Sequence, residues 1–335
     1  MISAHTNLLL RSPNWLGDAV MTLPAVQQLA ISGCKPAILC PEKLTDFWRL
    51  IPQIREVIPV QARIRATAKS LRPKKFDAAI IFPNSLKTGL EPFLAGIPKR
   101  YGFHGHNRRW LLTRSWPHPS QVKGYVHHAN HYLHLLQQLE QTSTDPSHQS
   151  LQLEQITNTP RFSPVPKPAP STLTTKPYLA LCPGAEYGPA KRWLTERYAQ
   201  TVNRIRAKHD LEVLVLGTKG DQEIASRLKI QCSKPIRDLT GKTTLAEFLT
   251  LIANSRLALC NDSGAMHVAA MFGTPAVAVF GSTEPRLTGP LGDSVTVIRE
   301  HVPCSPCFLR ECPLDNRCML AISVQQVTEA CLKKL

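Results

Sequence analysis

The stretch from Arg256 to Pro285 (RLALCNDSGAMHVAAMFGTPAVAVFGSTEP) carries polar residues of the types that hold a phosphate or a sugar. Asp262, the hydroxyl of Ser263 and the backbone N–H groups of Ser263 and Gly264 stand where a turn meets a predicted helix. Unsatisfied N–H groups and the helix dipole make such a helix start a binding place for anions. His267 falls in the first turn of the same helix. An ordinary helix cap has the same composition, so this loop alone leaves both interpretations open.

Apolar runs on both sides predict the elements that hold this loop. Leu257–Cys260 and Ala276–Phe280 have the length and composition of buried strands, and Ala265–Phe272 between them is typical of a helix. Gly273 fits the left-handed position that ends such a helix. The stretch therefore predicts a strand, helix and strand, with the polar residues at the first turn.

A further carboxylate, Asp18, also stands between a predicted strand and a predicted helix. The strand is Asn7–Arg11, the loop SPNWLGD follows, and helical composition begins at Ala19, with Pro24 in the first turn of a second helical segment. The helix dipole stabilises an acid at this position. From its place in the chain alone, a helix cap is the favoured interpretation of Asp18, and a functional carboxylate is the alternative.

Strands and helices alternate through the chain, which favours an α/β fold with parallel, doubly wound sheets. The alternation stops in a stretch rich in Pro, Ser and Thr, from about Gln152 to Lys176, and then restarts. Two sheets joined in this way would face each other across a cleft lined by the loops at their carboxyl edges. The predicted parts are a first domain over 1–160, a linker over 161–176, a second domain over 177–322, and a C-terminal helix over 323–335 with the option of packing back on the first domain.

Other loops at the predicted carboxyl edges also offer donors. Asn84, Ser85 and Lys87 follow the predicted strand Ala78–Phe82, with Lys99 and Arg100 further along the same segment, although ordinary surface lysines would give the same pattern. In the second half, Lys191 and Arg192 follow a glycine-rich turn and would face Ser263 and Gly264. A nucleotide-triphosphate P-loop at GKT is excluded because Ile236 stands where its first glycine belongs, and no G-x-G-x-x-G follows the first strand.

Composition limits the class of protein. The 335 residues are 43% hydrophobic, so the chain can bury a large core, and it has neither a signal-peptide core nor an 18-residue apolar span. We therefore expect a soluble, cytoplasmic protein. The net charge of +16 implies an anionic partner, which could be a phosphorylated ligand, a nucleic acid or a membrane surface. Nucleic acid is disfavoured because the basic residues are dispersed and no aromatic-rich basic motif occurs.

Two groups of residues could bind a metal. Cys304, Cys307, Cys312 and Cys318 form a C-x2-C-x4-C-x5-C pattern, which suits a structural zinc site, buried thiols or redox-paired thiols. A histidine-rich segment places three side chains on one face of a predicted helix, where either a metal site or a polar helix face would explain them. These histidines are His127, His131 and His134.

Four motifs together resemble the lipopolysaccharide heptosyltransferases of glycosyltransferase family 9. They are NWLGDAVMTLPAV, PNSLKTGLEPFLAGIPKR, CPGAEYGPAKRW, and NDSGAMHVAA with GTPAVAVFGSTEP. The resemblance runs from Leu8 to about Val327, and PGAEYGPAKRW and PNSLKTGL favour the branch that adds the second heptose. It implies a GT-B fold with two Rossmann-like domains, the acceptor domain first and the nucleotide-sugar domain second.

The resemblance also implies an activity. A heptosyltransferase of this branch moves L-glycero-D-manno-heptose from ADP-heptose to the first heptose of the lipid A–Kdo–heptose core, with inversion and without a metal or another cofactor. Asp18 matches the general base, Lys191 the phosphate-binding lysine, and Asp262 the residue that holds heptose hydroxyls. The remaining donor-binding positions are Ser263, Gly264, His267 and Gly217, and the acceptor-binding positions are Asn84, Ser85 and Lys87.

Such an enzyme would work at the anionic cytoplasmic face of the inner membrane as a peripheral protein, without nucleic acid. Another family 9 enzyme that adds a different core heptose would share every catalytic residue. The alternative from a different class is a non-catalytic protein that binds anionic surfaces or nucleic acid, which the charge alone would allow.

Overall fold

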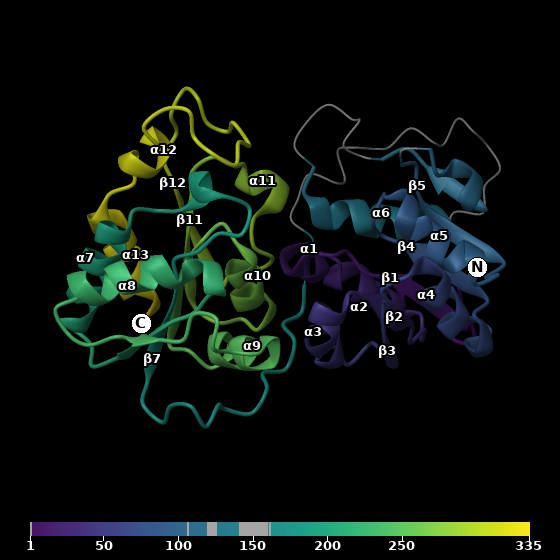
Figure 1. Ribbon diagram of the computed structural model, residues 1–335, viewed down its shortest axis with the longest axis horizontal. Helices are drawn as coiled ribbons and strands as arrows, with labels where there is room; N and C mark the ends of the chain where they lie inside the picture. The colour runs from purple at the N-terminus through teal and green to yellow at the C-terminus, as the bar shows by residue number, and fades with distance from the viewer. Residues whose placement is uncertain (1, 106, 119–125, 141–159, 161) are drawn as a thin grey trace. The chain divides into compact units, whose positions relative to one another are not determined.

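The computed structural model describes residues 2–105, 107–118, 126–140, 160 and 162–335. The chain divides into two compact units, residues 1–162 and 163–335. Each unit is an α/β structure built on its own parallel sheet (Figure 1). This confirms the fold class that the alternation of strands and helices predicted.

The first unit has six strands in the order β3-β2-β1-β4-β5-β6. Every neighbouring pair runs parallel, and the central strand β1 is buried because Leu8, Leu9 and Leu10 have no exposed surface. The helices form two groups, with α1 and α2 on α6, and α4 on α5. The strands are β1 (Leu8–Arg11), β2 (Ala37–Cys40), β3 (Glu56–Pro59), β4 (Ala78–Ile81), β5 (Lys99–Phe103) and β6 (Arg114–Trp116). The helices are α1 (Leu16–Met21), α2 (Leu23–Ile31), α3 (Thr45–Arg49), α4 (Ile64–Leu71), α5 (Leu86–Leu94) and α6 (His128–Glu140).

The second unit repeats this plan with the strand order β12-β11-β10-β7-β8-β9. Its helices also form two groups, α7 with α8 and α13, and α9 with α10. The strands are β7 (Tyr178–Cys182), β8 (Glu212–Val215), β9 (Arg237–Asp238), β10 (Leu257–Asn261), β11 (Ala276–Phe280) and β12 (Val295–Arg299). The helices are α7 (Thr195–Arg206), α8 (Gln222–Gln231), α9 (Leu245–Ala253), α10 (Gly264–Met271), α11 (Pro285–Thr288), α12 (Arg317–Ala321) and α13 (Val324–Lys334).

In each sheet the chain winds outward to one edge and then returns to the middle. The strand order reverses between β1 and β4 in the first unit, and between β7 and β10 in the second. Ligands of doubly wound sheets bind at the carboxyl ends of the strands at such a switch point, because the two loops diverge there. The loops after β1, β4, β7 and β10 are therefore the places to look for a site.

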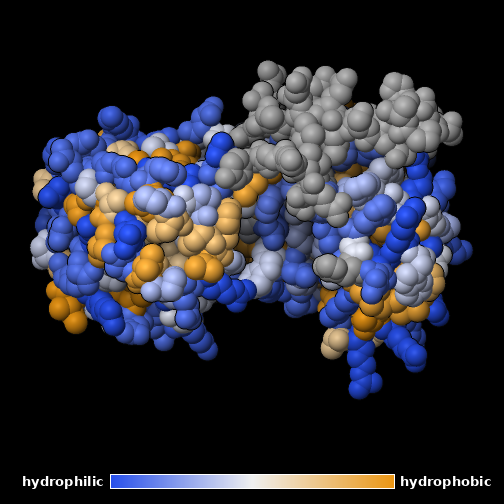
Figure 2. Space-filling view, turned by 90° about the horizontal axis from the view of Figure 1, so that it is seen from above, coloured by the Kyte–Doolittle hydropathy of each residue, from blue (hydrophilic) through white to orange (hydrophobic). Residues whose placement is uncertain are grey.

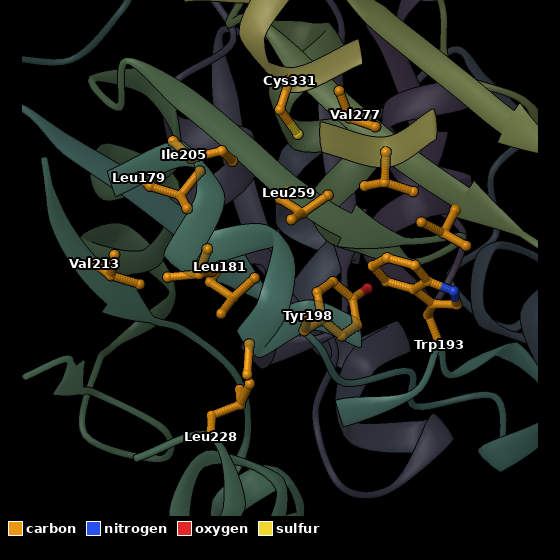
Figure 3. Packing of buried hydrophobic residues seen from close by; sticks show 14 of the residues in the cluster. Leu179, Leu181, Trp193, Tyr198, Ile205, Val213, Leu228, Leu259, Val277 and Cys331 are labelled. Carbon is orange, nitrogen blue, oxygen red and sulfur yellow. The ribbon is translucent and has the colours of Figure 1, made fainter. Parts of the chain in front are cut away.

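The core of the second unit includes the C-terminal helix. Figure 3 shows Cys331 of α13 near the strand residues Leu259 and Val277. In the same cluster the rings of Trp193 and Tyr198 pack edge to face, with their centroids 5.0 Å apart. Val327 and Cys331 have no exposed surface. In the described structure α13 thus packs on α7 and on the sheet of its own unit.

The proline-rich segment over 161–176, predicted as a linker, is held to the second unit where it is described. The Val165 N–H donates to the Met271 carbonyl at 2.8 Å, and Asn254 Nδ2 donates to the Pro168 carbonyl at 3.2 Å. The backbone carbonyls of a segment without secondary structure still need hydrogen-bond donors, and these contacts supply them. The compact second unit accordingly begins at residue 163.

Two basic residues lie at the other end of the sheet from the one predicted. Lys99 and Arg100 open β5 and so lie at its amino end, whereas the sequence placed them in a loop at the carboxyl edge. The Arg100 guanidinium is used internally, with Nε donating to the Leu111 carbonyl at 2.7 Å.

No helix in the described part of the chain is long and apolar enough to cross a membrane.

Candidate functional site

The loop after β10 forms the predicted helix start. Ser263 is the N-cap of α10 in an extended conformation, with φ −154° and ψ 174°, and its side chain makes no capping hydrogen bond. The first N–H groups of α10 therefore receive no side-chain partner from the cap residue. Gly264 stands at the first helical position, and among the described residues no hydrogen-bond acceptor is found for its N–H, which suits an anion at the switch point.

A charged pair stands beside this helix start. Lys191 Nζ lies 2.6 Å from Asp262 Oδ2, and both side chains are largely buried, with 14% and 4% exposed. The Thr283 hydroxyl donates to the same carboxylate oxygen at 2.5 Å. The sequence predicted that Lys191 and Asp262 would serve one site, and they are in direct contact. The contact with Thr283 was not predicted, because it depends on β11 ending next to β10.

Asn261, the last residue of β10, explains how the Lys191 loop is held in place. Its Oδ1 accepts from the Trp193 N–H at 2.9 Å and from the Tyr198 hydroxyl at 2.7 Å. Its Nδ2 donates to the Pro183 carbonyl at 2.7 Å and to the Gly184 carbonyl at 3.3 Å. The buried amide thus satisfies all its hydrogen-bonding positions and fixes both ends of the segment 183–193.

The loop after β8 closes tightly on the same segment. Asp221 accepts hydrogen bonds from the N–H and hydroxyl of Thr218 at 2.8 and 2.9 Å. A methyl group added at Gly217 would lie 2.8 Å from Asp221 Oδ2, and one added at Gly184 would lie 2.3 Å from Asp221 Oδ1. Gly217, a predicted donor-binding position, therefore has at least a packing role: it leaves room for the Asp221 carboxylate.

The segment that begins at Cys307, the second cysteine of the motif, contacts both the Lys191 loop and the loop after β11. The N–H groups of Cys307 and Phe308 donate to the Ser282 carbonyl at 3.1 and 2.9 Å. The Tyr187 hydroxyl donates to the Phe308 carbonyl at 2.7 Å, and the Ala190 N–H donates to the Arg310 carbonyl at 3.0 Å. These contacts tie the Lys191 loop to the residues that follow β11.

The four cysteines do not form the zinc site that their spacing suggested. In the described residues no group of three or more His, Cys, Asp or Glu side chains is arranged to hold a metal ion. Cys318 is buried in the core at the start of α12, where its sulfur packs on Gly281, whereas Cys304 is exposed. Burial raises the pKa of the Cys318 thiol, and Cys304, Cys307 and Cys312 add to this rise.

In the first unit, Asp18 lies in the first turn of α1 and is half-buried. Its charge reaches α6, because burial and the nearby Asp18 carboxylate both raise the pKa of Tyr132. The preceding loop is ordered by Arg11, which pairs with Glu91 at 2.5 Å in the core and donates to the Ser12 carbonyl at 2.6 Å. Asp18 thus lies in the helix that follows the carboxyl end of β1, and the strand ends at a buried ion pair.

The loop after β4 carries Asn84, Ser85 and Lys87. Ser85 caps α5, because its hydroxyl accepts from the Thr88 N–H at 3.4 Å, and Lys87 is exposed on the first turn. Asn84 Oδ1 lies 3.5 Å from a guanidinium nitrogen of Arg108. The predicted acceptor residues are therefore at the switch point of the first unit, and one of them also caps a helix.

Arg108 organises this loop and was missed by the sequence analysis. Its side chain is fully buried and donates to the Phe103 carbonyl at 3.1 and 2.8 Å and to the Ser85 carbonyl at 3.4 Å. Burial lowers its pKa to about 10. An arginine in a loop gives no sequence signal for burial, since most arginines are exposed.

The histidines of α6 lie close together, and His131 and His134 are buried. His131 is 5% exposed, its ring lies 4.9 Å from that of His118 and 5.1 Å from that of His128. Burial lowers the pKa of His131 to about 3 and that of His128 to about 4, with the neighbouring histidines adding to both effects. These residues are part of the core of the unit, and the described residues offer no metal-binding group here.

The second unit thus brings together Lys191, Asp262 and the N-terminus of α10, with His267 buried at 4% exposure on the helix behind them. The first unit brings Asp18 and the loop 84–87 to its own switch point. A cation, a carboxylate and free N–H groups in one place suit a ligand with phosphate and hydroxyl groups.

Comparisons with known proteins agree with this chemistry. The family described as glycosyltransferase family 9 (heptosyltransferase) matches residues 64–317. The lipooligosaccharide heptosyltransferase 2 of Haemophilus influenzae is 31% identical over 312 residues, which cover 88% of each chain. The lipopolysaccharide heptosyltransferase 2 of Escherichia coli is 32% identical over 315 residues, which cover 87% of each chain. The solved structure of the ADP-heptose LPS heptosyltransferase II of E. coli matches with a TM-score of 0.78 at 26% identity over 98% of both chains. The similarity therefore extends over both units.

Proposed function

Because this chain belongs to glycosyltransferase family 9, the heptosyltransferases, we propose that it transfers L-glycero-D-manno-heptose from ADP-heptose to the first heptose of the lipopolysaccharide inner core. This is the reaction of a heptosyltransferase II. Two observations support the proposal. The similarity to relatives named heptosyltransferase 2 covers most of the chain, and the structural neighbour has the GT-B fold.

One observation carries the donor half of this proposal. The Lys191–Asp262 pair lies at the N-terminus of α10, at the switch point of the second unit. A nucleotide diphosphate sugar presents a diphosphate and adjacent sugar hydroxyls. Lys191 and the N–H groups of Ser263 and Gly264 would bind the phosphates, and Asp262 would accept hydrogen bonds from heptose hydroxyls. In the absence of a ligand, the two side chains neutralise each other.

The reaction would proceed with inversion and without a metal. Asp18 takes the proton of the acceptor hydroxyl as the hydroxyl oxygen attacks the anomeric carbon from the face opposite the diphosphate. The bond from that carbon to the phosphate oxygen breaks, and its electron pair leaves with ADP. Lys191 stabilises the charge that develops on the leaving diphosphate, which is the electrostatic part that a divalent cation supplies elsewhere.

The acceptor would bind at the loop 84–87 of the first unit. Lys87 is exposed and positively charged, which suits an anionic or phosphorylated core sugar. On the face shown in Figure 2, hydrophilic residues are spread widely, with smaller hydrophobic areas between them. The protein has a net charge of +16, which favours contact with an anionic surface. We therefore propose that it works as a peripheral protein at the anionic cytoplasmic face of the inner membrane, where its lipid-linked acceptor would lie.

The acceptor can be tested directly. Purified protein is incubated with ADP-heptose and, in separate reactions, with two defined acceptors, one ending in Kdo and one ending in a single heptose. The masses of the products are measured by mass spectrometry. We expect one heptose to be added to the heptose-terminated acceptor only. Transfer only to the Kdo-terminated acceptor would instead assign the chain to the enzyme that adds the first heptose.

A simpler measurement separates an enzyme from a protein that merely binds anions. A ligand that binds the folded state stabilises it by RT ln(1 + [L]/Kd), so the unfolding temperature rises with the ratio of ligand concentration to Kd. We expect ADP to raise the unfolding temperature, whereas single-stranded and duplex oligonucleotides at the same phosphate concentration leave it unchanged. The reverse pattern would favour a nucleic-acid-binding protein.

A further inference from the structure

Two cations share one aromatic ring beside the Lys191 loop. Lys191 Nζ lies 4.8 Å from the centroid of the Tyr187 ring, and Arg310 Cζ lies 5.3 Å from the same centroid. The two charged groups are therefore at most about 10 Å apart, the two ring distances taken end to end. An aromatic ring attracts cations through its quadrupole, so Tyr187 can hold both side chains in place.

The backbone of Arg310 is fixed on the same loop. The Arg310 carbonyl accepts from the Ala190 N–H at 3.0 Å, and the Tyr187 hydroxyl donates to the Phe308 carbonyl at 2.7 Å. A methyl group added at Gly188 would lie 2.4 Å from the Arg310 carbonyl oxygen, so the two backbone segments approach each other as closely as a glycine allows. These contacts hold Arg310 near Lys191 without using its guanidinium.

The guanidinium also differs from Lys191 in its partners. Lys191 is paired with Asp262, whereas none of the ion pairs found among the described residues involves Arg310, and its side chain is exposed. A planar guanidinium with five donors binds phosphate oxygens in pairs. A second cation that is fixed in position and has no carboxylate partner in the described structure is suited to the second phosphate of a diphosphate.

We propose that Arg310 binds the diphosphate of the donor together with Lys191, and that Tyr187 is the platform that spaces the two charges. This inference rests on the proposed function for the identity of the donor. Its ligand chemistry, however, requires only two linked phosphates, so it can be tested apart from the nucleoside and the sugar.

The test compares three anions by isothermal titration calorimetry, namely inorganic pyrophosphate, ADP and AMP. The Arg310→Gln variant is expected to bind pyrophosphate and ADP about tenfold more weakly than the wild type, the scale of a lost charge-assisted hydrogen bond. AMP, which lacks the second phosphate, should lose less than about threefold in affinity. Arg310→Lys restores part of the affinity because it keeps the charge.

Arg317→Gln is the matched control, because Arg317 lies in the same part of the chain, is half-exposed and is paired with Asp315 at 3.0 Å. It removes the same charge and should leave all three affinities unchanged. Wild-type affinity for pyrophosphate in Arg310→Gln would overturn the proposal, as would equal losses for AMP and ADP or an equal loss in Arg317→Gln.

Tyr187 is tested with two variants. Tyr187→Phe keeps the ring and loses only the hydrogen bond to Phe308, so pyrophosphate affinity should stay within about threefold of the wild type. Tyr187→Leu removes the ring and should weaken binding toward the level of Arg310→Gln; unchanged affinity would show that the ring is no platform.

Failure of the proposed function would look different. If pyrophosphate binding depends on Arg310 but the wild type binds UDP or GDP as tightly as ADP, the assignment of the donor nucleotide is wrong and the role of Arg310 stands.

Discussion

At the scale of single residues, the proposed transfer depends most directly on Asp18. Replacing Asp18 with Ala removes the group that accepts the acceptor proton, so we expect kcat to fall by about 10²-fold to 10⁴-fold. Donor affinity, measured calorimetrically with ADP, should stay within about threefold because the donor residues lie in the other unit. Asp46→Ala is the control, since Asp46 is also an acid in the first turn of a helix. A near wild-type rate in Asp18→Ala would show that Asp18 is only a helix cap.

Thr283 offers a finer change in the donor site. Thr283→Val keeps the shape of the side chain but removes the hydrogen bond to Asp262, so the carboxylate that faces Lys191 loses one of its two contacts. A lost hydrogen bond to a charged group corresponds to about 1.5 to 3 kcal/mol, so we expect the KM for ADP-heptose to rise about tenfold or more.

Thr328 supplies the control for Thr283. It is also buried, but its hydroxyl has no hydrogen-bond partner in the described structure, and Thr328→Val should therefore leave KM unchanged and not destabilise the protein. Equal kinetics for Thr283→Val and the wild type would mean that Asp262 does not need this contact for donor binding.

At the scale of elements, the position of the Lys191 loop relative to β10 depends on Asn261. Asn261→Ala would leave the Tyr198 hydroxyl and the Pro183 carbonyl buried without partners, at a cost of about 1 to 3 kcal/mol for each unsatisfied group. We expect a loss of several kcal/mol in the free energy of unfolding, measured with urea, together with weaker ADP binding.

A gentler variant separates stability from positioning. Tyr198→Phe removes one of the four hydrogen bonds of Asn261 and leaves the two that hold residues 183 and 184. We expect a loss of about 1 kcal/mol in stability and ADP affinity within about twofold. If Asn261→Ala were to bind ADP as tightly as Tyr198→Phe does, Asn261 would have no part in positioning Lys191.

The same elements show what the sequence could predict. Ala276–Phe280 is a continuous apolar run, and it was predicted with the bounds that β11 has, because this strand is buried on both faces. The strands β5, β6, β9 and β12 lie in the outer part of each sheet and carry charged or polar residues, so their sequences lack such a run.

The candidate site was predicted in part for the same reason. Asp262, Ser263 and Gly264 follow one strand directly, so local patterns were sufficient to place them together. Thr283, Asn261 and Arg108 act through contacts between segments far apart in the chain. Local patterns do not reveal those contacts, because they depend on which strands become neighbours and which loops those strands bring together.

At the scale of the whole molecule, the two units differ in the ionisable groups that they bury, and acid should therefore change their stability by different amounts. The first unit buries His131 in a neutral form, because burial lowers its pKa to about 3, against about 6.5 in an unfolded chain. Between these values the unfolded state binds more protons than the folded state. The stabilisation is therefore complete above pH 6.5 and is lost progressively as the pH falls toward 3.

At pH 5 this difference corresponds to about 2 kcal/mol for His131 alone. We expect the free energy of unfolding of the first unit to fall by at least that amount between pH 7 and pH 5, measured by urea denaturation with fluorescence and with ADP present to stabilise the second unit.

His131→Leu should reduce this pH dependence, because Nε2 of His131 has no hydrogen-bond partner among the described residues and an apolar side chain can replace it. His301→Leu, at an exposed position, should leave the pH dependence as it is in the wild type. If the His131 variant were to lose stability with acid as steeply as the wild type, His131 would not be a group that responds to acid.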